Sequence, residues 1–314
     1  IQGFGEYGFP ESHAASFALL VYASAWVKRH HPDIFLCGLL NSQPMGFYSA
    51  SLLVQDARRH GVTVLPPDAA ASDWESTLAA GGVRLGLREI KGFARDAGER
   101  IAAARRVAPF ADVAELAARA GLARRDLDRL AAADALLSLA GHRRQAAWAA
   151  TASVVQGDLF DHAPVQEAAL ALPAPGEGEN LVADYRALGL SLRRHPLSLL
   201  RNQLAARRFV PAAELRQAGH RALVRAAGIV VGRQRPGTAT GIVFVTLEDE
   251  SGLTNVVVHP QLVEKQRREL LGARLLGVYG QLQVEGEVVH LVAKRLVDLS
   301  TWLGRLETVS RDFH

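Results

Sequence analysis

The turn formed by Ile90, Lys91, Gly92 and Phe93 has the residue types that bind a phosphate group. A glycine between two hydrophobic residues lets the backbone approach an anion, and the N–H groups at the start of the following helix point toward it. Lys91 and Arg95 add positive charge. This pattern predicts a helix-hairpin-helix turn in which Lys91, Gly92 and Arg95 contact nucleic-acid phosphates. A plain turn between two helices is the alternative.

A second, weaker copy of this hairpin follows along the chain. Its turn reads Ala133-Asp134-Ala135, so an aspartate stands where a glycine is expected. Without glycine the backbone approaches a phosphate less closely. We therefore expect the second hairpin mainly to complete the packing of the module. Arg124 and Arg125, just before it, are candidate contacts to the DNA backbone.

The segment between residues 151 and 180 lacks helical periodicity and is rich in Ala, Pro, Gly and Glu, which is typical of a linker. Within it lies Gln156-Gly157-Asp158-Leu159-Phe160. Bulky apolar residues in a linker favour a peptide that inserts Leu159 and Phe160 into a partner's pocket, with Gln156 and Asp158 beside it. The alternative is that Leu159 and Phe160 pack against the chain's own helices.

The last third of the sequence reads as three strands, a helix and two further strands. This is the order of an OB-fold, a five-stranded barrel that binds oligonucleotides, although another small barrel would have similar signals. Its Phe244 is a candidate platform for base stacking or, equally, a core residue, because strand alternation separates it from Val243 and Val245. Further candidate DNA contacts are Arg225, Arg233, Arg235, Lys294 and Arg295.

The sequence shows no pattern for catalysis or for a resident metal. The histidines have no ligand spacing, and no P-loop, nucleophile elbow or pair of metal-binding carboxylates is present. We therefore predict no catalytic residue, no metal site and no cofactor in this chain. One cysteine, Cys37, excludes a disulfide framework and favours a reducing, cytoplasmic setting. No apolar run is long enough to span a membrane.

The 314 residues are 49% apolar and carry a formal net charge of +4, as expected for folded domains. The helix that follows Ser12 is apolar nearly all round, which predicts burial on several faces. We expect an α+β multidomain chain. Its predicted parts are a helical segment (1–70), a tandem helix-hairpin-helix module (71–150), a linker (151–180), a helical connector (181–220), an OB-fold (221–300) and a tail (301–314).

Residues 5–19, Trp26-Val27-Lys28, His31-Pro32 and Leu65-Pro66-Pro67-Asp68 together resemble the end of the fingers domain of bacterial C-family DNA polymerases. The order of fingers, tandem helix-hairpin-helix, clamp-binding peptide and OB-fold is also that of this family. Two further features resemble its error-prone branch: His195-Pro196 before the barrel, and an end of the chain soon after it. The first residue, Ile1, favours a piece taken from the interior and C-terminal part of a longer protein.

The resemblance implies that the full-length protein carries out DNA-templated nucleotidyl transfer in damage-induced mutagenesis and translesion synthesis, with magnesium in a palm domain before Ile1. The implied partners are DNA, the sliding clamp (beta) and ImuB-like and ImuA-like accessory proteins. The clamp would bind Gln156, Asp158, Leu159 and Phe160. The sequence departs from the family at Glu11, where replicative relatives often have lysine, and at the second hairpin.

Three other interpretations stay open from the sequence. The alternatives to an error-prone polymerase are a stand-alone DNA-binding adaptor, against which Ile1 and the fingers-like opening argue, and the equivalent region of a replicative alpha subunit. Within the family, the barrel is either a nucleic-acid-binding module or mainly a protein-docking module.

Overall fold

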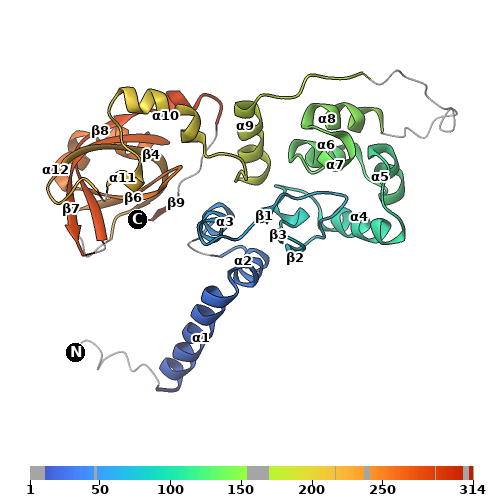
Figure 1. Cartoon of the computed structure of the whole chain (residues 1–314), viewed down its shortest axis with the longest axis horizontal. Coiled ribbons are helices and arrows are strands. Elements are labelled where there is room, and N and C mark those ends of the chain that lie inside the picture. Colours follow the sequence, from blue (N-terminus) through green and yellow to red (C-terminus); the bar gives the residue numbers. More distant parts are fainter. Residues whose placement is uncertain are drawn as a thin grey trace. The chain divides into compact units, whose positions relative to one another are not determined.

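The computed structural model describes residues 11–45, 48–153, 170–215, 217–236, 241–286, 288–306 and 311–313. The chain divides into two compact units, Ile1–Pro175 and Gly176–His314 (Figure 1). Each unit has its own buried core, and we describe them in turn.

The first unit is mainly helical. Its helices are α1 (Glu11–His30), α2 (Pro32–Asn41), α3 (Ala50–Arg59), α4 (Arg95–Val107), α5 (Val113–Ala120), α6 (Arg124–Ala132), α7 (Leu137–Ala140) and α8 (Arg143–Ala152). A small sheet in the order β1-β3-β2 and the short 3-10 helix η2 (Leu87–Glu89) precede α4. The strands are β1 (Val64–Leu65), β2 (Thr77–Ala79) and β3 (Gly82–Arg84).

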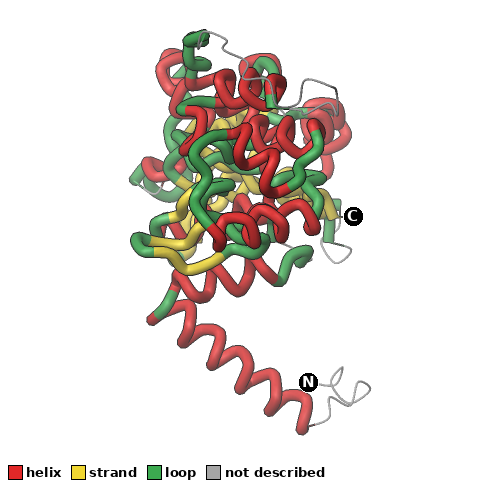
Figure 2. The backbone as a smooth tube through the Cα atoms, turned by 90° about the vertical axis from the view of Figure 1, so that its right-hand side faces the viewer, coloured by secondary structure: helices red, strands yellow, loops and turns green. Residues whose placement is uncertain are grey.

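Helix α1 is not buried on several faces, and this expectation is corrected. Figure 2 shows it extending away from the rest of the first unit. Leu19 and Tyr22 expose 70% and 71% of their surface. The reason is that the ordered contacts of α1 are at its C-terminal end, where Lys28 Nζ lies 2.9 Å from Asp56 Oδ2 of α3. An apolar composition is therefore not sufficient to bury the first turns of α1.

The hairpin module, α4 to α8, is held by a core to which α4, α5, α6 and α8 contribute buried residues. Ile101, Leu116, Leu127 and Leu130 are fully buried, because they recur at helical spacing on the inward faces of α4, α5 and α6. Gly121 ends α5 in the left-handed conformation, with φ of +57°. This compact packing sets the position of both hairpin turns.

The second unit contains a closed five-stranded barrel, as the sequence predicts. Its strands are β4 (Leu223–Gln234), β5 (Val243–Asp249), β6 (Gly252–Val258), β7 (Leu275–Glu285) and β8 (Val288–Asp298). The sheet order is β5-β6-β8-β7-β4, and pairing of β4 with β5 closes it. Helices α12 (Pro260–Lys265) and α13 (Arg267–Gly272) stand between the third and fourth barrel strands. A short strand, β9 (Arg311–Phe313), pairs in parallel with the end of β4.

A second apolar layer covers part of the barrel's outer surface. It is built by α9 (Glu177–Leu188), α10 (Pro196–Ala206) and the 3-10 helix η3 (Ser300–Leu303), with the short helix α11 (Ala212–Leu215) before the barrel. Leu197, Leu204 and Phe209 pack there against Ala227 and Leu275 of the barrel. Residues 181–220, expected as a connector, therefore belong to the same compact unit as the OB-fold.

Candidate nucleic-acid interface

The first hairpin turn presents its backbone to solvent. Ile90 and Phe93 are buried and anchor the turn, whereas Lys91 and Gly92 between them are exposed. Gly92 has φ of +67°, a left-handed conformation that glycine adopts without strain. The alternation of buried and exposed residues therefore leaves an open stretch of backbone beside a lysine.

Arg129 of α6 is a component of this turn that the sequence reasoning missed. Its Nη1 donates a hydrogen bond of 2.7 Å to the carbonyl oxygen of Lys91. A Cβ atom on Gly92 would collide with the Arg129 guanidinium. Glycine is thus favoured here by its φ, and any larger residue would also displace the Arg129 guanidinium from the turn. No local signal could reveal this contact, because the two residues are 38 positions apart in the sequence.

The start of α4 is less available to an anion than the sequence suggested. Asp96 accepts hydrogen bonds from Arg100 and from the backbone N–H of Ala97, and both lower the pKa of its carboxyl group. Arg95 is exposed and pairs with Glu99 at 2.8 Å. Since a carboxylate already lies at this helix end, positive charge near the turn comes mainly from Lys91 and Arg129.

The second hairpin turn keeps the backbone shape of the first without its glycine. Asp134 has φ of +60°. Arg124 pairs with Asp128 at 2.9 Å and donates to Thr151 at 2.9 Å, which orients it along the helix surface. Arg125 is exposed. The turn therefore carries an aspartate at the position of Gly92, and an alanine, Ala133, at the position of Lys91.

The five predicted cationic residues of the barrel do not form one group. Arg225 on β4 and Arg295 on β8 are each in register with Tyr279 on β7. Their guanidinium carbons lie 4.7 Å and 5.6 Å from the centre of the Tyr279 ring. Lys294 is exposed next to Arg295. Tyr279, which the sequence reasoning missed, thus brings together two of the five predicted cations, Arg225 and Arg295.

Arg233 is corrected from a DNA contact to a structural residue. Only 6% of it is exposed. Its Nε donates a 2.7 Å hydrogen bond to the carbonyl oxygen of Leu270, and its Nη2 donates to that of Ala273, at the end of α13. It therefore satisfies carbonyl groups that the helix itself leaves unpaired. Arg235, two residues later, is exposed at the end of β4.

Phe244 lies on the outer surface of β5 and not in the barrel core. Val243 and Val245 on either side belong to the core cluster, whereas Phe244 is half-buried. It faces Gln234 of β4 and Val257 of β6 in the sheet register. Of the two alternatives for Phe244, this position favours the surface platform, on the β5–β6 face with which OB-folds bind oligonucleotides.

The predicted partner peptide, with Gln156, Asp158, Leu159 and Phe160, lies outside the described residues. Among the residues that the structure describes, no three His, Cys, Asp or Glu side chains are grouped so that they could hold a metal ion. In the same residues, no helix has the length and apolar character needed to cross a membrane.

Comparison with known proteins assigns both modules. A family model for a helix-hairpin-helix motif matches residues 61–146, and one for an OB-fold nucleic acid binding domain matches residues 224–299. Among solved structures, asparaginyl-tRNA synthetase from Pyrococcus horikoshii matches 32% of this chain and 24% of its own, at 20% identity and a TM-score of 0.26. That similarity is too low to bear on function.

Curated relatives match the chain from end to end. The error-prone DNA polymerase of Dechloromonas aromatica (strain RCB) is 79% identical over 316 residues, which cover 100% of this chain and 31% of that protein. The error-prone DNA polymerase of Azoarcus sp. (strain BH72) is 67% identical over 324 residues, covering 100% and 30%. The chain thus spans less than a third of the length of these relatives. With its helix-hairpin-helix and OB-fold modules in the predicted order, the chain belongs, as a part, to the family of error-prone DNA polymerases.

Proposed function

We propose that this chain is the C-terminal region of an error-prone DNA polymerase that positions DNA and partner proteins, while nucleotidyl transfer takes place elsewhere in the full-length enzyme. The observation that carries the proposal is the end-to-end match to such polymerases, with a nucleic-acid-binding module in each compact unit. Such a region would act in translesion synthesis and damage-induced mutagenesis, in the cytoplasm.

The two modules suit different forms of DNA. An exposed turn with Lys91, Gly92 and Arg129 contacts backbone phosphates without reading bases, as suits the duplex behind a primer end. The barrel offers Phe244 for stacking and exposed cations for phosphates, which suits the single-stranded template. Both contacts depend on charge, so binding should weaken as salt is raised.

Magnesium, which the family implies for nucleotidyl transfer, is assigned no step in this chain. Two-metal catalysis requires carboxylates that hold both ions, and the described residues do not offer such a group. The residues present therefore do not fit the ion. What this chain contributes is the position and orientation of the DNA.

The segment that joins the two modules is proposed to bind the sliding clamp (beta) through Gln156, Asp158, Leu159 and Phe160. Accessory proteins of the ImuB-like and ImuA-like kind would assemble with the same region. Replacing Leu159 and Phe160 by alanine should abolish capture of this chain by immobilised clamp. Leu170→Ala, an exposed leucine just beyond the segment, is the matched control and should leave capture intact.

The proposal is tested with the full chain and labelled oligonucleotides. Fluorescence anisotropy should show binding of a primer-template and of single-stranded DNA, both weakened by salt. Primer extension with magnesium and all four nucleotides should give no product. Extension by this chain would contradict the placement of catalysis elsewhere, and lack of DNA binding at low salt would contradict the positioning role.

A further inference from the structure

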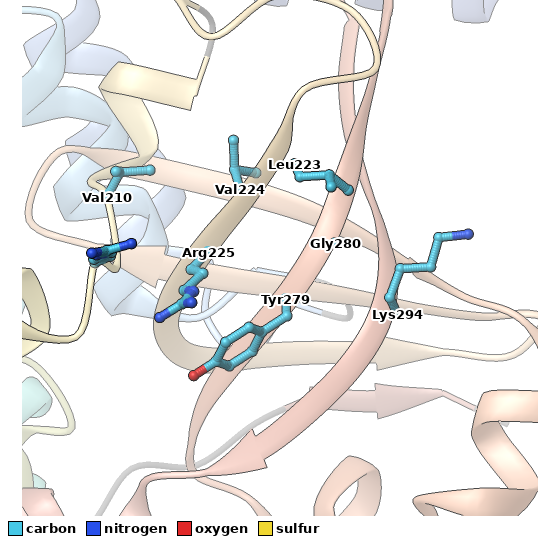
Figure 3. Close-up of a pocket in the computed structure, with 8 residues that line it drawn as sticks. Val210, Leu223, Val224, Arg225, Tyr279, Gly280 and Lys294 are labelled. Atoms are coloured by element: carbon cyan, nitrogen blue, oxygen red, sulfur yellow. The ribbon is translucent and has the colours of Figure 1, made fainter.

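An open pocket of about 450 Å³ lies on the outer surface of β4, β7 and β8 (Figure 3). Among the residues that line it are three cationic side chains, Arg208, Arg225 and Lys294, and none of its lining residues is acidic. We propose that this pocket, which we name the Tyr279 pocket, binds the phosphodiester backbone of a nucleic-acid strand. It is separate from the β5–β6 face that carries Phe244.

Arg225 is held in place before any ligand arrives. Its Nη1 donates a 3.0 Å hydrogen bond to the carbonyl oxygen of Arg207, and its guanidinium lies 4.7 Å from the centre of the Tyr279 ring. Figure 3 shows the two side chains next to each other. A guanidinium fixed in this way loses little side-chain entropy when it contacts a phosphate.

Lys294 reaches the pocket because of a β-bulge. Tyr279 pairs with Arg295, but the next residue, Gly280, pairs with Ala293, so Lys294 is the extra residue of β8. The bulge turns Lys294 and Arg295 outward together, whereas a regular strand would send one of them into the barrel. Bulges of this kind commonly re-aim a side chain for function.

The third cation, Arg208, is placed by the end of α10. Its backbone N–H donates a 2.8 Å hydrogen bond to the carbonyl oxygen of Ala205, and its φ is +62°. A left-handed conformation is costly for a residue with a Cβ. It brings Arg208 to the side of the pocket that Val210 also lines.

The arrangement around Tyr279 favours phosphates over bases. Arg225 and Arg295 approach the Tyr279 ring from the two neighbouring strands, so guanidinium groups already occupy positions where a base would stack. No ion pair joins Arg208, Arg225, Lys294 or Arg295 to a carboxylate within the described part of the chain. Unneutralised cations beside an aromatic ring attract an anion.

A nucleic-acid strand fits the pocket better than a free phosphate ion. Arg225 and Lys294 stand on either side of β7 (Figure 3), and two strand spacings separate their backbones by roughly 10 Å. An extended polyanion contacts both cations, whereas a single ion meets one at a time. Leu223, which is 79% exposed, adds an apolar surface for the sugars. This inference rests on the proposed function and assigns part of the DNA to a specific surface.

The test compares Lys294→Gln with Lys265→Gln in the full chain. Both variants remove one exposed lysine from the second unit, but Lys265 lies on α12 and does not line the pocket. With a 20-nucleotide oligothymidine in 0.1 M salt, K294Q should bind about fivefold more weakly. Its slope of log K against log salt should fall by ~0.7, the value for one phosphate of a single strand. K265Q should bind like the unsubstituted chain.

The outcomes separate this inference from the proposed function. Equal affinities of K294Q and K265Q, while the chain still binds DNA, would overturn the pocket assignment and leave the positioning role standing. Absence of DNA binding by the unsubstituted chain would overturn both. Calorimetry with inorganic phosphate forms the second arm: binding that K294Q loses, without any loss of oligothymidine affinity, would overturn the choice of a nucleic-acid strand as the occupant.

Discussion

Gly92 and Asp134 hold the same left-handed backbone conformation, with φ of +67° and +60°, at the turns of the two successive hairpins. The second turn has therefore kept the left-handed conformation of a phosphate-binding hairpin. Asp134 adopts this conformation at a cost in backbone strain, because it has a Cβ atom. It also adds a carboxylate to this turn. This relationship makes the charge at Asp134 directly testable.

Replacing Asp134 by asparagine should tighten binding of duplex DNA by about threefold at low salt, because asparagine tolerates the left-handed conformation and removes the negative charge. Asp134→Gly should tighten it at least as much, since the backbone then approaches the phosphate more closely. Anisotropy with a labelled duplex measures both. Unchanged affinity in both variants would show that the second hairpin does not face the DNA.

Gly92→Ala should destabilise the first unit more than Gly121→Ala does. Both glycines have positive φ, so each substitution costs about 1–2 kcal/mol of backbone strain. Only at Gly92 does the new Cβ also displace the Arg129 guanidinium, whereas Gly121 has open space around it. Denaturant unfolding gives the two stabilities, and duplex binding should fall only in G92A. Equal effects of G92A and G121A on stability and on duplex binding would show that Arg129 is not part of the hairpin's DNA interface.

Arg233→Met should destabilise the barrel by about 2–4 kcal/mol, because buried carbonyl groups at the end of α13 lose their charged donor. Arg235→Ala should leave stability within about 0.5 kcal/mol, since its side chain is exposed. Single-stranded DNA binding should weaken in R235A. A stable R233M variant that loses only DNA affinity would show that Arg233 contacts DNA and is not a structural residue.

Phe244→Ala should weaken single-stranded DNA binding by about 1–3 kcal/mol, the contribution of a base stacked on an aromatic ring. Val245→Ala is the neighbouring control. Because Val245 is 1% exposed and part of the barrel core, its loss should lower the free energy of unfolding without a specific effect on DNA affinity. Normal DNA binding by F244A would exclude Phe244 as a base-stacking platform.

The second unit should lose stability as pH falls from about 6.5 to 4. Burial of His195 disfavours its charged form and lowers its pKa to about 4, although nearby Glu250 and Asp249 act in the opposite direction. In this range the unfolded chain binds a proton at His195 and the folded chain does not, so protonation favours unfolding by about 3 kcal/mol at pH 4.

His195→Asn tests this pH dependence. His195 accepts a hydrogen bond from the Leu197 N–H as the N-cap of α10, and asparagine can cap the helix without titrating. Amide hydrogen exchange of α10 and β5 at pH 7, 6 and 5 reports the local stability. The variant should show a smaller loss than the unsubstituted chain; the same loss in both would assign the effect to another group.

Several features of the fold follow from local sequence. Strand alternation and turns predict the five strands and the interrupting helix of the barrel, because a half-buried strand repeats every two residues. The buried Ile90 and Phe93 around an exposed Lys91 and Gly92 are likewise predictable, since a hairpin turn is defined by its own few residues. End-to-end similarity to error-prone polymerases agrees with the family resemblance of the sequence.

Two register shifts decide which basic side chains face outward from the barrel, and simple alternation along the strands could not predict this. Arg225 and Arg233 share one parity along β4, so a regular strand turns both outward. A register shift between Val230 and Gly232 reverses this pattern, and Arg233 turns inward to α13. The shift at Tyr279 and Gly280 sends Lys294 and Arg295 outward together.

What the sequence by itself determined is therefore the order of modules, the two hairpin turns and the set of candidate cations, because these depend on residue type and short-range spacing. Tertiary structure alone decided which cations act together. Arg129 reaches Lys91 across 38 residues, and Arg225, Tyr279 and Arg295 become neighbours only when three strands pair. Such contacts depend on register and packing, which no stretch of sequence encodes locally.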